Sequence, residues 1–178
     1  MPSLERFVEQ CRDAVRSGDG RKEVTEILRE YLADVDGVMK ELGPPEKAGL
    51  MPLFKADDLT IINVVWQPGM TIPPHNHEMW ANIGIYSGRE DNIFWRRIKD
   101  DPDGHIEAAG ATALSAGEVA PLGKDIIHSV TNPIPRLTGA IHVYGGDFFE
   151  AERSEWDPEA LEERKLDIEA LKARFADN

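Results

Sequence analysis

The chain has 178 residues, of which 41% are hydrophobic and 30% are charged, and its formal net charge is −13 at pH 7. This length is typical of one domain, so we expect a single domain over residues 1–178. The composition excludes a disordered acidic tail and a membrane-embedded protein. Because 33 acidic side chains oppose 20 basic ones, phosphate groups would repel the chain, and we expect neither nucleic acid nor an anionic membrane as a partner.

Cysteine usage and the N-terminal sequence predict the compartment. Cys11 is the only cysteine, which excludes a disulfide within the chain. The first ten residues, MPSLERFVEQ, are charged and amphipathic and contain no apolar signal core. We therefore expect a cytoplasmic protein in a reducing compartment. Cys11 lies on an apolar helical stripe, and we interpret its thiol as buried and inert.

The segment 1–46 is predicted to be helical. Apolar residues recur at helical spacing over residues 4–15 and again over residues 24–39. Gly18-Asp19-Gly20 separates the two stripes, and Pro44-Pro45 ends the second because proline cannot continue a helix. Two N-terminal helices follow from this pattern.

The segment 50–148 consists of strand-like runs separated by turn signals, which favours an all-β barrel or sandwich. The runs are rich in isoleucine, valine, tryptophan and tyrosine and cover residues 59–67, 81–87, 93–99, 126–132 and 137–144. A final helix is predicted over residues 157–176. Asp157 suits its N-cap and Pro158 its first position, and an apolar stripe from Leu161 to Phe175 would lie on the barrel.

The histidines are the most informative residues of the chain. His75 and His77 are two residues apart, so on a strand both imidazoles point to the same face and can bind one metal ion. His128 lies in a distant strand-like run that can converge on the same point of a barrel. Three imidazoles on one side of a metal leave positions open for substrate and dioxygen.

The two stretches that contain these histidines resemble the motifs of the cupin superfamily. They are GMTIPPHNHEMWANIGIYSG (residues 69–88) and GEVAPLGKDIIHSVTN (residues 117–132). The resemblance implies a mainly β fold, a cupin double-stranded β-helix barrel with two N-terminal helices and a C-terminal helix. The acid that usually follows the second histidine of the first motif is absent, since Ala81 and Asn82 stand there. Glu78 should point to the opposite face from His77 and is a poor substitute.

A cupin with three histidines and no such acid looks like the thiol dioxygenase branch, which includes cysteine dioxygenase and 3-mercaptopropionate dioxygenase. The segment AIHVYGG (residues 140–146) is similar to the Ser-x-His-x-Tyr relay of that branch. The resemblance implies that His142 and Tyr144 are catalytic residues. Ala140 stands in place of the relay serine, so the relay is expected to have two members.

The same resemblance implies a mononuclear non-haem iron(II) dioxygenase that oxidises a small thiol carboxylate to a sulfinate with O2. Imidazole ligands suit iron, nickel and zinc alike, and manganese is a further candidate, so the residues themselves do not choose the metal. Two alternatives stay open: a cupin oxygenase for a different chelating small molecule, and a non-catalytic cupin that binds a metal or a small molecule. Either a monomer or a homodimer is compatible with the sequence.

No substrate-binding residue can be assigned from the sequence. The thiol dioxygenases hold the substrate carboxylate with an arginine or glutamine on the strand before Leu59, where this chain offers only Lys47 and Lys55. A second possibility is the set of arginines that follow the first motif, although each suits a surface position. These are Arg89, Arg96 and Arg97. His105 lies in an acidic turn and is predicted to be solvated.

Overall fold

The structure is a computed structural model that describes residues 3–18 and 20–176; Asp19, which the sequence places in a helix break, lies outside the described residues. Within that part of the chain, strands form one five-stranded and one six-stranded sheet. The strands are β1 (Gly49–Lys55), β2 (Thr60–Trp66), β3 (Thr71–Asn76), β4 (Ala81–Ser87), β5 (Arg89–Arg97), β6 (Ile106–Ser115), β7 (Val119–Leu122), β8 (Ile127–Thr131), β9 (Thr138–Tyr144), β10 (Ser154–Trp156) and β11 (Glu163–Lys165). The helices are α1 (Leu4–Ser17), α2 (Gly20–Leu32), α3 (Val35–Leu42) and α4 (Ile168–Ala176).

The order of the strands defines the fold. The sheets read β1-β2-β9-β4-β7 and β11-β10-β3-β8-β5-β6. Strand β5 pairs with β6, β4 with β7, β3 with β8 and β2 with β9, all antiparallel. The chain from β2 to β9 is therefore one long hairpin whose two arms coil together and switch between the sheets. This is the cupin double-stranded β-helix, a double-sheet jelly roll, as the sequence predicted.

The barrel wall is buried on both sides where the N-terminal helices cover it. Every residue of β2 and β9 is buried. Along β2, Ile62 and Val64 point into the barrel core, and Ile61 belongs to a second apolar cluster shared with the helices. Burial on both faces explains why these strands appear in the sequence as nearly continuous apolar runs.

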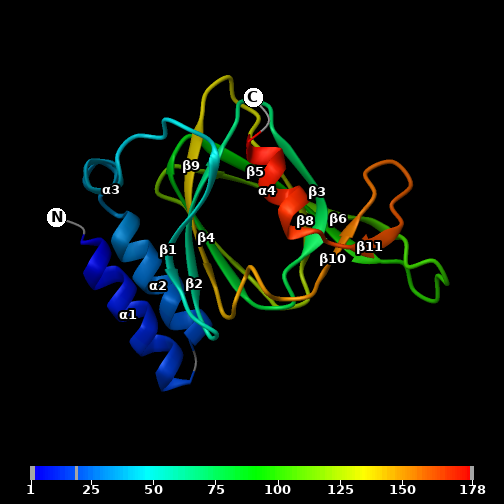
Figure 1. Ribbon diagram of the computed structural model, residues 1–178, viewed down its shortest axis with the longest axis horizontal. Coiled ribbons are helices and arrows are strands. Elements are labelled where there is room, and N and C mark those ends of the chain that lie inside the picture. The colour runs from blue at the N-terminus through cyan, green and yellow to red at the C-terminus, as the bar shows by residue number, and fades with distance from the viewer. Residues whose placement is uncertain (1–2, 19, 177–178) are drawn as a thin grey trace.

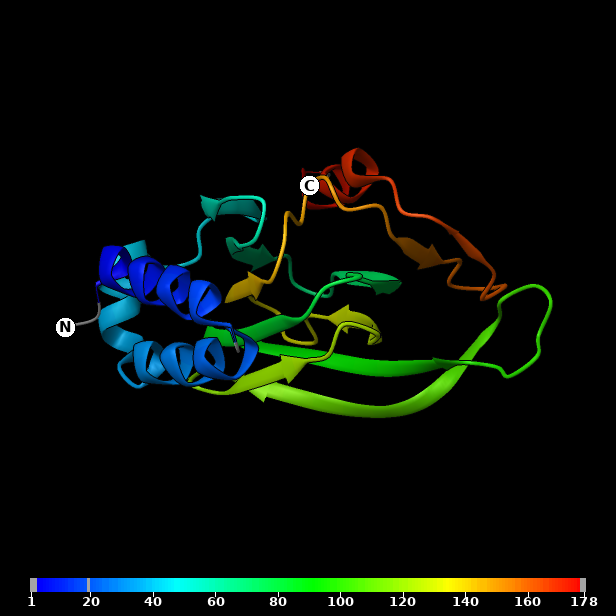
Figure 2. The ribbon, with the colours of Figure 1, turned by 90° about the horizontal axis from the view of Figure 1, so that it is seen from below.

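The described part of the N-terminal segment holds three helices, where the sequence predicted two. The second stripe breaks because Asp34 caps a new helix, α3, and its Oδ1 accepts a hydrogen bond from the backbone N–H of Gly37 at 2.9 Å. These helices gather at one end of the molecule, and the β5–β6 turn projects from the other (Figures 1 and 2). Cys11 is buried on α1 as expected, and burial raises the pKa of its thiol to about 12.

The prediction of a helix over residues 157–176 is wrong in its first half. Asp157 does cap a turn, because its Oδ1 accepts hydrogen bonds from the backbone of the next residues. Leu161 then adopts a positive φ of 56°, which ends the turn, and β11 pairs with β10 instead. The helix α4 begins at Ile168, and its Leu171 and Phe175 pack into the barrel core. None of the described helices is both long and apolar enough to cross a membrane.

The close approach of α2 to β4 depends on Gly84. A Cβ at this position would overlap the side chain of Leu32 and lie 3.1 Å from Cγ of Leu28. We expect Gly84→Ala to lower the free energy of unfolding by about 1–3 kcal/mol, because the helix must move away from the sheet. Gly110→Ala is the matched control, since a Cβ there meets no atom within 4 Å. Urea denaturation of both variants tests this, and equal losses of stability would contradict it.

Candidate metal centre

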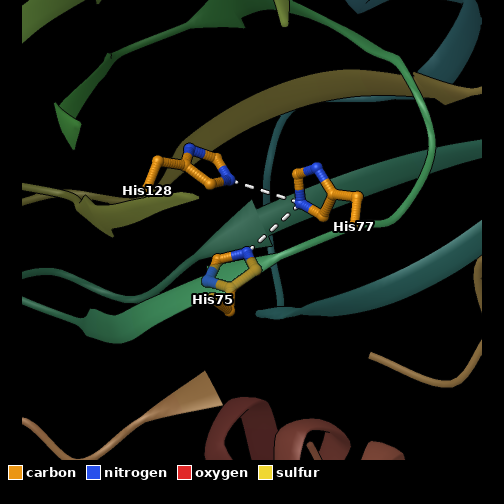
Figure 3. A group of neighbouring side chains, drawn as sticks. All are labelled: His75, His77 and His128. Atoms are coloured by element: carbon orange, nitrogen blue, oxygen red, sulfur yellow. Dashed lines mark hydrogen bonds between the residues drawn. The ribbon is translucent and has the colours of Figure 1, made fainter. Parts of the chain in front are cut away.

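Three histidines converge inside the barrel (Figure 3). His75 lies on β3, His77 directly follows that strand, and His128 lies on β8 opposite His75 in the strand register. Nε2 of His77 is 3.2 Å from Nε2 of His75 and 3.3 Å from Nε2 of His128. Nitrogen ligands about 2.1 Å from one metal ion lie roughly 3.0–3.5 Å from each other, so both distances fit ligands of a single ion. The ligand atoms of all three histidines lie within 4.8 Å of one another.

Hydrogen bonds orient two of the rings. Nδ1–H of His75 donates to the carbonyl of Pro73 at 3.0 Å, and Nδ1–H of His128 donates to Oδ1 of Asn92 at 2.7 Å. Because the proton sits on Nδ1 in each case, the lone pair of Nε2 faces the common point. Such bonds to the far nitrogen are typical of metal-ligating histidines, since they fix the tautomer and the direction of the ring.

Burial keeps the three imidazoles neutral. Desolvation lowers the pKa of His75 to about 4. The pKa values of His77 and His128 are lowered well below their ordinary value, first by burial and then by the neighbouring imidazoles. Neutral imidazole is the form that binds metals, so all three are ready to act as ligands at neutral pH. Glu78 is exposed and accepts a hydrogen bond from Asn76, so it takes no part in the cluster.

A small cavity of about 30 Å³ lies beside the cluster, large enough for about one or two water molecules. Its polar lining comes from His75, His128, His142 and Tyr144. Trp66 forms one wall, and Leu171 and Phe175 of α4 close it, with the rings of Trp66 and Phe175 5.2 Å apart. The helix that the sequence predicted to lie on the barrel therefore covers the metal-site-like cluster.

The structure brings His142 and Tyr144 together beside the three histidines. Nδ1 of His142 lies 3.0 Å from the hydroxyl of Tyr144, and the Tyr144 ring meets the His77 ring edge-on at 5.0 Å between centroids. Burial raises the pKa of Tyr144 well above its ordinary value, so the phenol is neutral at pH 7. The other nitrogen of His142, Nε2, lies 3.2 Å from the carboxylate of Glu90, a residue that sequence reasoning missed.

The basic residues considered from the sequence lie elsewhere. Lys47 is exposed, and Lys55 pairs with Asp147 on the surface. Each of the three arginines after the first motif pairs with a surface carboxylate: Arg89 with Asp91, Arg96 with Glu107 and Arg97 with Glu163. None of these side chains lines the cavity between the histidines and α4.

Three further polar side chains have structural contacts. Asn82 faces the helices, where it accepts a hydrogen bond from the hydroxyl of Thr25 at 2.6 Å. His105 lies in the β5–β6 turn and bonds to Asp101 at 2.9 Å, where 30% of its side chain is exposed. Trp95 donates its indole N–H to Ser129 at 3.0 Å.

Arg153 is the cationic residue that sequence reasoning missed. It follows the barrel and is only 5% exposed. Its Nη1 donates to the carbonyls of Phe148 and Ala151, but Nε and Nη2 are buried with no partner among the described residues. The guanidinium lies 4.2 Å over the ring of Phe148, which stacks against Tyr144 at 4.4 Å between centroids. Burial lowers the pKa of Arg153, and its charge in turn contributes to the lowered pKa of His77.

Comparison with known proteins finds solved structures that are similar to this chain at low sequence identity. No known family profile matches the chain. A protein from Bacillus halodurans shares 15% sequence identity with a TM-score of 0.50, over 61% of this chain and 77% of that one. An RmlC-like cupin from Methanocaldococcus jannaschii, described as a double-stranded β-helix, shares 12% identity with a TM-score of 0.46, over 60% and 85%. Bacillus subtilis oxalate decarboxylase shares 15% identity with a TM-score of 0.43, over 59% of this chain and 27% of that one.

The buried histidines predict the pH dependence of stability in the metal-free protein. The pKa of His75 is about 4 in the folded state, whereas its ordinary value is 6.5. As the pH falls, His75 is therefore protonated first in the unfolded state, which stabilises the unfolded state. Stability is therefore lost between pH 6.5 and about pH 4, and His75 alone accounts for about 2 kcal/mol at pH 5. His75→Asn keeps a donor for the Pro73 carbonyl and should flatten this dependence. Urea denaturation of the wild type and of His75→Asn at pH 5 and pH 7 measures this dependence in each protein. Equal stability of the wild type at the two pH values would contradict the prediction.

Proposed function

We propose that the protein is a mononuclear non-haem iron(II) dioxygenase that oxidises a small thiol carboxylate to a sulfinate. One observation carries the proposal: three buried, neutral imidazoles direct Nε2 at one point, and no carboxylate joins them among the described residues. A set of three neutral ligands leaves the full double charge of a divalent ion on the site. That charge favours an anionic ligand, and a coordinated thiol is deprotonated outright.

His75, His77 and His128 would hold the metal. Their nitrogen donors suit iron, nickel and zinc, and the choice of iron rests on the reaction, because activation of O2 needs a redox metal. When bound, iron supplies a coordination site for the substrate sulfur and the electrons that activate O2. The overall reaction joins a thiolate, RS⁻, and O2 to give a sulfinate, RSO2⁻, so both oxygen atoms enter the product and no other reductant is needed.

Arg153 would bind the carboxylate of the substrate, although it lines a neighbouring outer pocket with Ser154 and Arg164 rather than the cavity beside the histidines. A buried guanidinium with unpartnered N–H groups is costly, and an anionic ligand that accepts those hydrogen bonds removes the cost. The stack of Arg153 on Phe148 and of Phe148 on Tyr144 connects this charge to the edge of the histidine cluster. The short spacing between thiol and carboxylate in a small thiol carboxylate suits two such neighbouring sites.

The hydroxyl of Tyr144 and the ring of His142 would orient the substrate in the cavity. Both line it, and Tyr144 stays protonated because burial raises its pKa. The cavity is too small for the whole substrate, so α4, which closes it through Leu171 and Phe175, would shift to admit the ligand. Closure afterwards would exclude water from the reaction.

The metal and the reaction can be tested together. We expect protein loaded anaerobically with iron to bind about one iron per chain, and to consume O2 with at least one of 3-mercaptopropionate, cysteine and mercaptosuccinate, with sulfinate as the product. His128→Ala should lose the metal because it removes one of three ligands, whereas Arg96→Ala, which removes a surface side chain paired with Glu107, should keep it. Metal without O2 uptake on any thiol would contradict the thiol dioxygenase. O2 uptake with no sulfinate would favour an oxygenase for a different chelating molecule.

The role of Arg153 predicts a selective loss of affinity. We expect Arg153→Gln to raise the KM for 3-mercaptopropionate about 10- to 100-fold, because charge-assisted hydrogen bonds to the carboxylate are lost. The KM for 2-mercaptoethanol, which has no carboxylate, should stay unchanged. Arg164→Gln is the matched control, since Arg164 is exposed in the same segment and pairs with Glu155. Equal effects of Arg153→Gln on both thiols would contradict the assignment.

A further inference from the structure

Glu90 is a fully buried carboxylate whose two oxygens have different partners. Its exposure is 0%, and it lies on β5, inside the barrel. Oε1 accepts a hydrogen bond from Nδ2 of Asn92 at 3.1 Å, and Oε2 lies 3.2 Å from Nε2 of His142. Among the described residues, His142 is the basic side chain that contacts this carboxylate, and the contact is an ion pair only when the imidazole is protonated. These two contacts offset part of the cost of burying the carboxylate.

These contacts link the metal ligand His128 to Tyr144 in one chain of hydrogen bonds. Asn92, which donates to Glu90, also accepts from Nδ1 of His128 at 2.7 Å. At the other end, His142 contacts Glu90 through Nε2 and the hydroxyl of Tyr144 through Nδ1. Glu90 therefore lies at the centre of this chain, between the contacts that lead to His128 and the contacts that lead to Tyr144.

For a neutral His142, the donors and acceptors along this chain fix the position of every proton. Because Nε2 of His128 faces the other two imidazoles, its proton is on Nδ1 and Asn92 must present Oδ1 to it. The amide group of Asn92 then donates to Glu90. The second oxygen of Glu90 accepts the proton on Nε2 of His142, so Nδ1 of a neutral His142 is left to accept the hydroxyl proton of Tyr144.

We propose that Glu90 is the positioning residue of the site: it sets the tautomer of His142, and through Asn92 it holds the ring of His128. In this way Glu90, His142 and Tyr144 form a hydrogen-bonded relay of three residues, even though Ala140 stands in place of the relay serine and offers no hydroxyl. The logic is that of a carboxylate that orients a catalytic imidazole in a hydrolase triad. The inference rests on the proposed function for the metal and the substrate, but the tautomer of His142 can be measured without either.

Glu90→Gln tests whether Glu90 sets the tautomer of His142. Glutamine keeps the size of the side chain but replaces one of two acceptors with a donor. All hydrogen bonds can then be satisfied only if the amide N–H group faces Nε2 of His142 and the proton of that ring moves to Nδ1. We expect long-range ¹H–¹⁵N NMR of the metal-free and zinc-loaded protein to show His142 as the Nε2–H tautomer in the wild type and as the Nδ1–H tautomer in Glu90→Gln. An unchanged tautomer overturns the proposal.

Asn92→Leu tests whether Glu90 holds the ring of His128 through Asn92. The substitution cuts the link to His128 and leaves the contact between Glu90 and His142 in place. We expect zinc affinity to fall about 10- to 100-fold, as for other lost partners of metal-bound histidines, while His142 stays the Nε2–H tautomer. Asp91→Asn is the matched control: this neighbouring carboxylate pairs with Arg89 on the surface, and the variant should change neither readout. Undiminished zinc affinity in Asn92→Leu overturns the link to His128.

The turnover of thiol separates this proposal from the proposed function. With iron and 3-mercaptopropionate, Glu90→Gln should lower kcat by about 10- to 100-fold and leave KM within about threefold, since the hydroxyl of Tyr144 is reoriented but Arg153 is untouched. A wild type that shows the expected tautomer but no thiol turnover would refute the proposed reaction and retain the positioning role. Full turnover in Glu90→Gln would refute the role of Glu90 in catalysis.

Discussion

The register between β3 and β8 is the constraint on which the site depends. It places His75 opposite His128 on neighbouring strands, and His77 completes the group from the residues that follow β3. Since side chains alternate between the faces of a strand, a slip of one residue would turn His128 out of the barrel. Antiparallel pairing fixes this register at four positions, from Thr71 opposite Thr131 to Asn76 opposite Ile127, with an irregularity between Ile72 and His75. The fold therefore supplies the geometry that three separate side chains could not hold by themselves.

Among the buried polar and charged side chains of this acidic protein, those at the site differ in how their burial is compensated. The three imidazoles are neutral because burial lowers their pKa values. Glu90 is satisfied on both oxygens, which makes it a fixed element of the structure. Arg153 has two buried nitrogens without partners among the described residues, whereas Arg174 and Trp66 have one each, so Arg153 is the group we assign to an anion. The difference between a satisfied and an unsatisfied buried charge is the basis for assigning one to positioning and the other to binding.

Much of this arrangement could be predicted from local sequence patterns. The spacing of His75 and His77 and the apolar strand around His128 indicated a shared face, and the structure brings the three rings together. The alternation of His142 and Tyr144 likewise predicted neighbouring side chains, which the structure contains. These predictions succeed because the period of a strand is a local property, and the cupin-like motifs identify which strands meet.

The features that sequence reasoning missed depend on distant contacts. Glu90 lies in the run Arg-Glu-Asp-Asn, which has the composition of a solvated turn, and only the alternation along β5 buries it. Arg153 stands among acidic residues in a segment that looks exposed, but it is covered by its stack on Phe148. Asp157 does cap a turn, as the sequence predicted, but no helix follows it directly. The residues after this turn form β11, which pairs with β10, although their sequence pattern is helical.

The central claim is that three histidines hold an iron ion that binds the sulfur of a small thiol. X-ray absorption spectroscopy of the iron(II)-loaded protein, recorded with and without 3-mercaptopropionate under anaerobic conditions, tests it most directly. The account predicts scattering from imidazole rings in both samples and a sulfur neighbour of iron only when the thiol is present. Iron without imidazole scattering, or an iron environment that the thiol leaves unchanged, would contradict it.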